Sequence, residues 1–285
     1  QTDAYDDYLG SKVGGGNYSS VYKYIPHKDL AVIKRGKVRD DREFDYMTLS
    51  RERRIFHLTN DMVFNGETPH FPIMFESVDW GDESAIWFVL EAGLKDGETY
   101  MDDLSNHFKH GKITRDVLET SVAQMTAQAL LGIHALHHKL DVVHNDFCAR
   151  NILQENTNAA VLEYQLGDKF PPIRLKTSGN LFKIIDFGMA SGPSEEFYDP
   201  VSSEDMPKEM SKFDPSTWTV DLFPYPHNRV CEIFFDNPKK NDWYTHKNFD
   251  KHVTQFERVP PYVRDALFFL VHLCSWNSGW AKFAS

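Results

Sequence analysis

The first third of the chain alternates short apolar runs with turn residues, a pattern that predicts short strands. Residues 9–35 contain three such runs, and a further pair, Phe71–Val78 and Ala85–Glu91, flanks the turn at Asp79–Asp82. Between the two groups, residues Asp40–Asn60 are highly charged but carry apolar side chains at helical spacing, which predicts a helix with one packed face. Its apolar residues are Phe44, Met47, Ile55, Phe56 and Leu58.

The middle of the chain predicts helices. Residues Thr114–Lys139 have the strongest helical periodicity, and Thr114 is a suitable N-cap. Met101–Lys109 is a shorter amphipathic candidate, and the apolar run Phe268–Leu273 predicts a buried helix further along. The apolar stripe of the long helix indicates core packing, not a cofactor site: Leu118, Val122, Met125, Ala129, Ile133 and Leu136.

The most informative stretch is a polar segment enclosed by two apolar runs. Val142–Val143 and Ile152–Leu153 predict short buried strands, and the residues between them have the pattern His-x-Asp-x-x-x-x-Asn. This pattern places Asp146 and Asn151 on a loop that is held at both ends. Asp146 can orient or deprotonate a hydroxyl group, and Asn151 can ligate a metal ion through its side-chain oxygen.

Three other motifs accompany this loop. Asp186-Phe187-Gly188 follows the strand-like run Leu181–Ile185, while Ala31-Val32-Ile33-Lys34 and the glycine-rich turn Gly14–Val21 lie upstream. The glycines allow backbone N–H groups to approach phosphate oxygens. Lys34 ends a run that is apolar on both faces, so its ammonium group must reach solvent or be paired.

In this order, the motifs resemble those of the protein kinase superfamily from about Val13 to Asp186. The resemblance implies an α+β, bilobal protein-kinase-like fold. Residues 1–93 would form the smaller lobe, an antiparallel β-sheet with one helix, and residues 94–285 would form a larger, mainly helical lobe. ATP would bind between the lobes together with Mg²⁺, and the substrate would be a protein.

The resemblance also assigns roles to individual residues. Lys34 would contact the α- and β-phosphates of ATP and would be oriented by Glu52, with Glu43 as the alternative partner. Asp146 would be the catalytic residue that accepts or orients the substrate hydroxyl. The guanidinium group of Arg150 would reach the γ-phosphate.

The same resemblance implies the metal ligands and the nucleotide pocket. Asn151 and Asp186 would hold Mg²⁺, a hard ion that prefers oxygen ligands. Leu90 would be the gatekeeper, and backbone groups of Glu91 to Gly93 would bind the adenine edge. The residues expected around the nucleotide are Val13, Gly14, Gly15, Gly16, Tyr18, Ser19, Val21, Ala31, Lys34, Leu90, Glu91, Gly93 and Leu153.

The sequence departs from the kinase pattern at several points. Ser19 replaces the third glycine of the glycine-rich turn. Asn145 stands where many kinases carry an arginine that meets a phosphorylated residue, so we expect activity that does not depend on activation-loop phosphorylation. The interval between Asn151 and Asp186 is long for the family; the extra piece is about Gln154–Asn180, and its runs Val161–Leu166 and Ile173–Lys176 predict an inserted hairpin. Haspin-type and some viral kinases carry comparable insertions.

The chain after the Asp-Phe-Gly triplet also departs from the pattern. It contains no Ala-Pro-Glu motif, and Met206–Glu209 is the nearest degenerate form. Trp218–Phe223 resembles the start of the large helix of the second lobe, in which Asp221 would hold the backbone of the catalytic loop. Pro224 and Pro226 would interrupt that helix.

Two signals conflict about the amino acid that accepts the phosphate. The loop lacks the lysine that serine/threonine kinases place two residues after Asp146, and Ala149-Arg150-Asn151 resembles the tyrosine-kinase loop. However, Met189–Trp218 lacks the well-formed activation segment of tyrosine kinases, so we predict a serine/threonine kinase. The alternatives are a tyrosine or dual-specificity kinase, a pseudokinase scaffold and a small-molecule phosphotransferase.

Composition narrows the class further. The 285 residues are 41% hydrophobic and 26% charged, as in ordinary soluble globular proteins. The net charge of -11 argues against a nucleic-acid binder and is compatible with a basic protein substrate. The 3 cysteines are too scattered for a disulfide framework, so we expect an intracellular protein of the cytoplasm or nucleus, in the host cell if viral. The apolar runs are too short to span a membrane, and the oligomeric state is left open.

Overall fold

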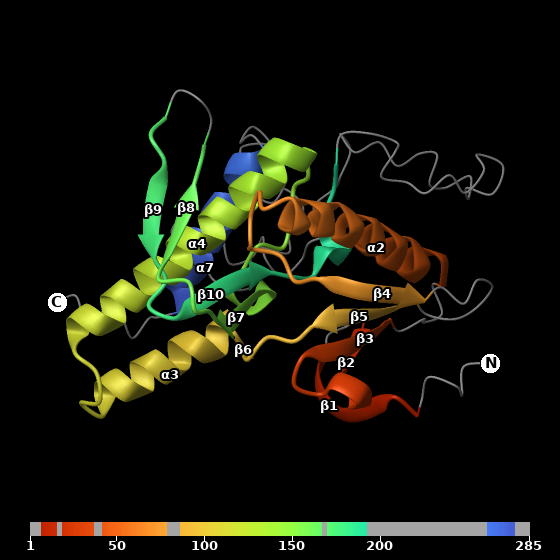
Figure 1. The fold of residues 1–285 in the computed structure, drawn as a ribbon, viewed down its shortest axis with the longest axis horizontal. Helices are drawn as coiled ribbons and strands as arrows, with labels where there is room; N and C mark the ends of the chain where they lie inside the picture. The colour runs from red at the N-terminus through yellow and green to blue at the C-terminus, as the bar shows by residue number, and fades with distance from the viewer. Residues whose placement is uncertain are drawn as a thin grey trace, which may run out of the picture.

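A computed structural model describes residues 7–15, 19–36, 42–78, 86–166, 170–192 and 261–276. Figure 1 shows a β-sheet with one long helix formed by the first part of the chain, followed by a mainly helical part that also carries short strands. The predicted α+β class is therefore confirmed. Within the described residues, no helix has the length and apolar character needed to cross a bilayer.

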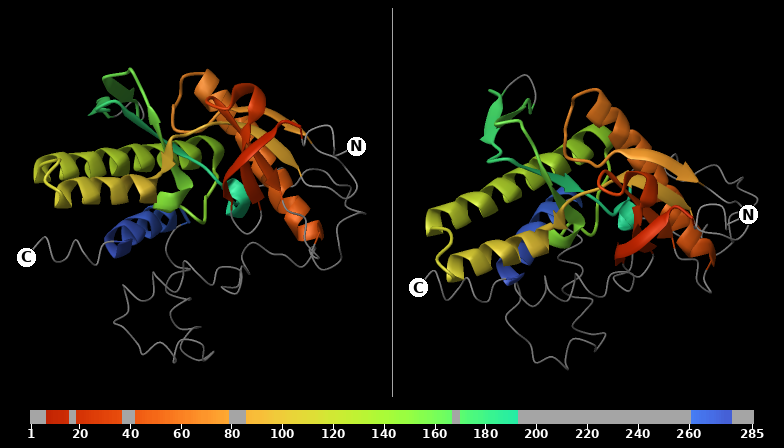
Figure 2. Two further views of the ribbon diagram at one scale, coloured as in Figure 1. Left: turned by 90° about the horizontal axis from the view of Figure 1, so that it is seen from below. Right: turned by 60° about the horizontal axis from the view of Figure 1, so that its bottom comes forward.

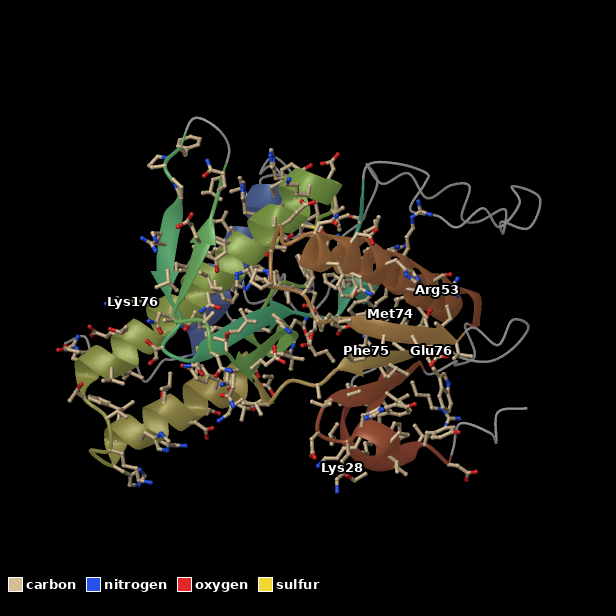
Figure 3. All side chains as sticks on the ribbon, in the orientation of Figure 1. Lys28, Arg53, Met74, Phe75, Glu76 and Lys176 are labelled. Atoms are coloured by element: carbon tan, nitrogen blue, oxygen red, sulfur yellow. The ribbon has the colours of Figure 1, made fainter. Side chains whose placement is uncertain are left out.

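The first part is built on a five-stranded antiparallel sheet with the order β1-β2-β3-β5-β4. The predicted strands are present, although the last two begin two or three residues later than the apolar runs. Their bounds are β1 Leu9–Gly15, β2 Ser19–Tyr24, β3 Ala31–Gly36, β4 Met74–Val78 and β5 Trp87–Glu91. β4 is an edge strand, on which Met74 is buried and the next residue, Phe75, is exposed (Figure 3).

Alternation along β3 decides which side chains face the long helix. Ala31 and Ile33 pack with Trp87 and Val89 on one face of the sheet. Because successive side chains of a strand point to opposite faces, Lys34 faces the other side. The sheet therefore delivers one buried lysine toward the interior of the molecule.

The long helix α2, Arg42–Phe64, covers that inner face. It extends four residues beyond the predicted end at Asn60, because Met62 is still part of the buried core. Asn60 ties the helix to the edge strand: its Nδ2 donates to the Met74 carbonyl oxygen at 2.7 Å, and its Oδ1 accepts from the Met74 amide at 2.9 Å. The position of α2 is thus linked to the chain that follows it.

The second part contains helices α3 (Gly97–Lys109), α4 (Arg115–Leu140) and α7 (Pro261–Trp276), with α4 packed against both of the others (Figure 2). Thr114 caps α4 as predicted, through its hydroxyl and the Val117 amide at 3.3 Å. α3 begins four residues before the predicted Met101 because Asp96 caps it, accepting from the Thr99 amide at 2.7 Å.

Short strands join the two parts. β6 (Lys95–Asp96), β7 (Ile152–Asn156) and β10 (Asn180–Ile184) form one small antiparallel sheet. The predicted insertion is a hairpin of β8 (Val161–Tyr164) and β9 (Ile173–Lys176), whose end is marked by Lys176 in Figure 3.

The first apolar run of the central loop was wrongly expected to form a strand. Val142 and Val143 are buried, but Val143 makes only an isolated bridge, with Ser191. The second run does begin a strand, β7. The backbone of the catalytic loop therefore continues into a sheet at one end, whereas at the other end its backbone pairing is limited to two hydrogen bonds between Val143 and Ser191.

Candidate active site

Lys34 is the centre of a buried charge cluster. Its Nζ donates to Glu52 Oε1 at 2.6 Å and to Asp186 Oδ1 at 2.8 Å. Lys34 and Glu52 are buried, whereas the Asp186 side chain is 49% exposed. Glu52 is the partner of Lys34 that was predicted from the sequence; the side chain of Glu43, the alternative, lies outside the described residues.

The charges of this cluster depend on one another. Burial by itself would lower the pKa of Lys34, but the carboxylates of Asp186 and Glu52 outweigh burial and raise it above its ordinary value. Lys34 in turn lowers the pKa of Asp186, although burial opposes this. Burial raises the pKa of Glu52, and Lys34 offsets that increase only in part. The lysine is thus held charged, and it is what allows two carboxylates to lie so close together.

An aromatic column ties Asp186 to both parts of the molecule. The ring of Phe187 lies 5.2 Å from Phe56 on α2, 5.4 Å from His144 on the catalytic loop and 6.0 Å from Phe71, measured between centroids. The Phe187 amide also donates to Glu52 Oε1 at 3.3 Å. Because Phe187 follows Asp186 directly, this packing fixes the place at which Asp186 meets Lys34.

Asp265 on α7 anchors the catalytic loop. Its carboxylate accepts from the His144 amide at 2.7 Å, from the Asn145 amide at 2.9 Å and from His137 Nε2 at 2.8 Å. The contact with the loop backbone was predicted for Asp221, which lies outside the described residues; among the described residues, Asp265 makes such a contact.

A local signal for Asp265 was present. It is the only acidic residue of the apolar helix Pro261–Trp276, it is buried, and a proline at the first helical position is a common start signal. A carboxylate inside such a helix requires partners, because an unpaired buried charge is strongly unfavourable.

Asp146 and Asn151 lie together on the catalytic loop. The Asn151 Nδ2 donates to the Asp146 carbonyl oxygen and to Asp146 Oδ2, both at 2.8 Å. Arg150 Nη2 lies 4.0 Å from Asp146 Oδ1. Burial raises the pKa of Asp146, with a smaller increase from Asp186, while His144 and Arg150 act in the opposite direction. A carboxylate with a raised pKa, next to a fixed amide and a cation, is suited to accept a proton or orient a hydroxyl group.

The donor set near Asp146 suits Mg²⁺. Asn151 uses its amide nitrogen for Asp146, so its side-chain oxygen is the atom that can ligate a metal ion. Asp186 contributes a half-exposed carboxylate whose Oδ1 already contacts Lys34. Carboxylate and amide oxygens are hard ligands, which Mg²⁺ prefers.

The glycine-rich turn contributes two strands of the sheet. Val13, Gly14 and Gly15 end β1, and Ser19 and Val21 lie on β2. Gly14 pairs with Val21, and a Cβ atom on Gly15 would lie 2.8 Å from the Ser19 carbonyl oxygen, at a φ of +150°. The backbone at Gly15 therefore requires glycine. Gly16 and Tyr18, which were predicted to contact the nucleotide, lie outside the described residues.

The segment after β5 joins the two parts. Ala31 and Leu90 are buried, and Ala31 pairs with Glu91. Gly93 lies against Leu153 of β7, since a Cβ atom on Gly93 would lie 2.9 Å from the Leu153 Cβ. The structure thus joins four of the residues expected around the nucleotide in two pairs, Ala31 with Glu91 and Gly93 with Leu153.

Two backbone amides in the segment expected at the adenine edge are used inside the protein. The Glu91 amide donates to the Ile73 carbonyl oxygen at 2.8 Å, and the Ala92 amide donates to the Leu30 carbonyl oxygen at 3.0 Å. The backbone groups of Glu91 to Gly93 that lie outside these two bonds are the carbonyl oxygens and the Gly93 amide, so the expected contact with the adenine edge stays a prediction for those groups.

A second buried lysine was missed. Lys183, in the middle of β10, donates to Glu91 Oε2 at 2.7 Å and to Glu155 Oε2 at 2.6 Å. Glu91 Oε2 also accepts from the Ile73 amide at 2.9 Å. The signal was a lysine inside an apolar strand, which must be paired when it is buried.

Asn145 contacts the start of the segment after the Asp-Phe-Gly triplet. It has a left-handed backbone with a φ of 63°, and its Nδ2 donates to the Met189 carbonyl oxygen at 3.0 Å and to Ser191 Oγ at 2.9 Å. Arg51 of α2 donates to the Ala190 carbonyl oxygen at 3.2 Å. Both parts of the molecule therefore hold residues 189–191. The degenerate motif at Met206–Glu209 lies outside the described residues.

Of two comparisons with known proteins, one identifies a family. A search of the curated proteins gives no match. A family model described as "Protein kinase domain" matches residues 8–205, which is well over half of the chain. The match includes Lys34, Glu52, Asp146, Asn151 and Asp186. The chain therefore belongs to the protein kinase domain family.

Proposed function

We propose that the chain is an active kinase that transfers the γ-phosphoryl group of ATP to a serine or threonine hydroxyl of a protein. The observation that carries the proposal is the Lys34 cluster, in which one ammonium group contacts both Glu52 and Asp186. In protein kinases, the lysine–glutamate ion pair and the metal-binding aspartate must both be in place for transfer. An intracellular location is part of this proposal, since ATP is the phosphoryl donor.

Each residue of the site has a role in this proposal. Lys34 holds the α- and β-phosphates, and Glu52 and the aromatic column fix the direction of its ammonium group. Asp146 orients the substrate hydroxyl and accepts its proton, supported by the hydrogen bonds from Asn151. Asn151 and Asp186 hold Mg²⁺, which neutralises phosphate charge when bound. Most of the rate enhancement comes from positioning and charge neutralisation.

Independence from activation-loop phosphorylation is also part of the proposal. Asn145 carries no charge, so it cannot form an ion pair with a phosphate as an arginine does. Its amide instead binds Met189 and Ser191 through neutral hydrogen bonds. These contacts support a segment start that is held without a phosphate group. Phosphatase-treated protein should keep its activity, and loss of activity that rephosphorylation restores would refute this.

Serine or threonine is the proposed acceptor, and the alternative has one specific observation in its favour. Arg150 lies 4.0 Å from Asp146, so its guanidinium group can approach a phosphate at this place, as expected of the tyrosine-kinase loop. The absence of an Ala-Pro-Glu motif from the sequence supports serine or threonine. Phosphoamino-acid analysis decides between them, and phosphotyrosine alone would overturn the proposal.

The central test is transfer of label from γ-labelled ATP to a basic protein, with an acidic protein and buffer alone as the matched acceptors. We expect labelling of the basic protein, because the chain carries a net charge of -11. Asp146→Asn should lose most of the turnover, by about 10³-fold, while nucleotide binding stays near that of the wild type. Wild-type turnover in Asp146→Asn would show that the catalytic assignment is wrong. Nucleotide binding without any transfer would favour a scaffold.

A further inference from the structure

The inserted hairpin β8–β9 presents one aromatic side chain to the interior. Tyr164, the last residue of β8, is 8% exposed, whereas Val161 on the same strand is 39% exposed and Ile173 on β9 is 38% exposed. Near the base of the hairpin, Gln124 of α4 donates to Ser178 Oγ at 2.9 Å. The hairpin therefore packs against α4, beside which it lies in Figure 1 and Figure 2, and it buries Tyr164.

Tyr164 binds His70. The two rings stack with 5.6 Å between centroids and 9° between planes, and the Tyr164 hydroxyl lies 2.7 Å from His70 Nε2. His70 Nδ1 lies 2.7 Å from the Phe182 carbonyl oxygen. Because a carbonyl oxygen only accepts, Nδ1 carries the proton and Nε2 accepts from the tyrosine hydroxyl. Burial lowers the pKa of His70 to about 4, so this neutral form persists at neutral pH.

His70 lies in the connection between α2 and β4, next to the active site. Its carbonyl oxygen accepts from the Ile184 amide at 2.7 Å, two residues before Asp186. The following residue, Phe71, packs against Phe187 of the aromatic column. On another side, a Cβ atom on Gly132 of α4 would lie 2.8 Å from the His70 Cβ. His70 is thus enclosed by α4, β10 and the hairpin.

We infer that Tyr164 is a positioning residue for phosphoryl transfer, through which the inserted hairpin holds the α2–β4 connection and keeps Glu52 of α2 against Lys34. The path is short: Tyr164 fixes His70, Phe71 follows it, and Phe71 and Phe56 both contact Phe187. The effect on turnover rests on the proposed function. The effect on the position of α2 is independent of the proposed function.

The kinetic test compares Tyr164→Ala with Tyr164→Phe and with a matched control, Phe170→Ala. Phe170 is an aromatic residue of the same hairpin, but it is 62% exposed. Loss of Tyr164 lowers the population in which Lys34 and Glu52 are paired, so kcat should fall about tenfold in Tyr164→Ala while KM for ATP changes less than about twofold. Tyr164→Phe keeps the ring and removes only the hydroxyl, so we expect a loss of about threefold. Phe170→Ala should match the wild type.

A double-mutant cycle separates positioning from general destabilisation. In a Glu52→Gln background the pairing is already weakened, so Tyr164→Ala should lower kcat by less than about twofold more. An unchanged tenfold loss in that background would overturn the inference. If Tyr164→Ala does not fold, the same cycle is measured with Tyr164→Phe in the wild type and in Glu52→Gln.

A readout that needs no activity distinguishes failure of this inference from failure of the proposed function. Hydrogen exchange of the α2 amides should be faster in Tyr164→Ala than in the wild type and in Phe170→Ala. If the wild type transfers no phosphate, the proposed function fails, and the exchange measurement still decides the inference. Equal exchange in all three proteins overturns it.

Discussion

Each of two buried lysines in this protein contacts two carboxylates, but the two pairs of carboxylates differ in their exposure to solvent. Lys34 contacts Glu52 and Asp186, and Lys183 contacts Glu91 and Glu155, all at 2.6 to 2.8 Å. At Lys34, one carboxylate is 1% exposed and the other 49% exposed. At Lys183, the two carboxylates are 19% and 24% exposed.

The difference separates a site that can react from a site that holds structure. The half-exposed carboxylate of Asp186 can accept a further ligand while Oδ1 stays on Lys34. The Lys183 cluster is closed by the protein itself, because Glu91 Oε2 also accepts from the Ile73 amide. One lysine, two carboxylates and good geometry are therefore not enough to identify a catalytic centre; exposure of one member matters as much as the contacts.

Replacing the exposed carboxylate is the strongest test of this comparison. Asp186→Ala should abolish Mg²⁺-dependent transfer, with a loss of at least about 10³-fold, because the metal ion loses its carboxylate ligand. The matched change at the closed cluster, Glu155→Ala, should leave turnover within about fivefold of the wild type. Steady-state assays of both variants provide the check. Comparable losses in the two variants would remove the distinction.

The second test removes the catalytic lysine. Lys34→Met should lower kcat/KM by about 10²-fold, because the phosphates lose their cation and α2 loses the ion pair. The fold should survive, since Glu52 can take up a proton: burial already raises its pKa, and the change removes the cation that opposed this. Activity assays together with circular dichroism would measure both effects. An unfolded variant would contradict this prediction.

The third test makes the same substitution in the closed cluster. Lys183→Met leaves Glu91 and Glu155 unpaired where they are three-quarters buried, so it should lower the free energy of unfolding by about 2 kcal/mol. Turnover should fall less than tenfold under conditions in which the variant is folded. Denaturant unfolding and activity measured on the same preparation give the two values. A larger effect on activity than on stability would place Lys183 in the reaction.

The smallest expected effect concerns pH. Asp146 must be deprotonated to accept a proton, and burial raises its pKa, so kcat/KM should fall on acidification at a higher pH than an ordinary aspartate would give. Arg150 lowers that pKa, so Arg150→Ala should move the fall to a still higher pH, by less than about one unit. Lys183→Met should leave the pH of this fall unchanged. A profile of kcat/KM against pH for the three proteins supplies the comparison, and a shift in the opposite direction for Arg150→Ala would refute it.

The sequence predicts elements and motif residues well where the signal is local. Alternation and helical spacing predict the sheet strands, α2 and α4, and the motifs bring Lys34, Asp146 and Asp186 into one site. The errors at element ends have local causes that periodicity does not detect, such as the Asp96 cap that starts α3 early.

The missing parts of the site depend on contacts between residues far apart in the sequence. Asp265 holds a loop 121 residues away, and His70 meets Tyr164 across 94 residues. Lys183 is recognisable in the sequence as a charge in an apolar strand, but its partners, Glu91 and Glu155, come from other strands. A single sequence shows that such a residue needs a partner and does not say which one.

The anchor at Asp265 also bears on how the protein is made. A ribosome delivers the sheet, the lysine and the catalytic loop long before it delivers α7, and domains tend to form in the order of synthesis. Until residue 265 has left the exit tunnel, the amides of His144 and Asn145 lack the carboxylate that holds them. A nascent or prematurely terminated chain can therefore carry every residue of the catalytic motifs and still lack an ordered catalytic loop.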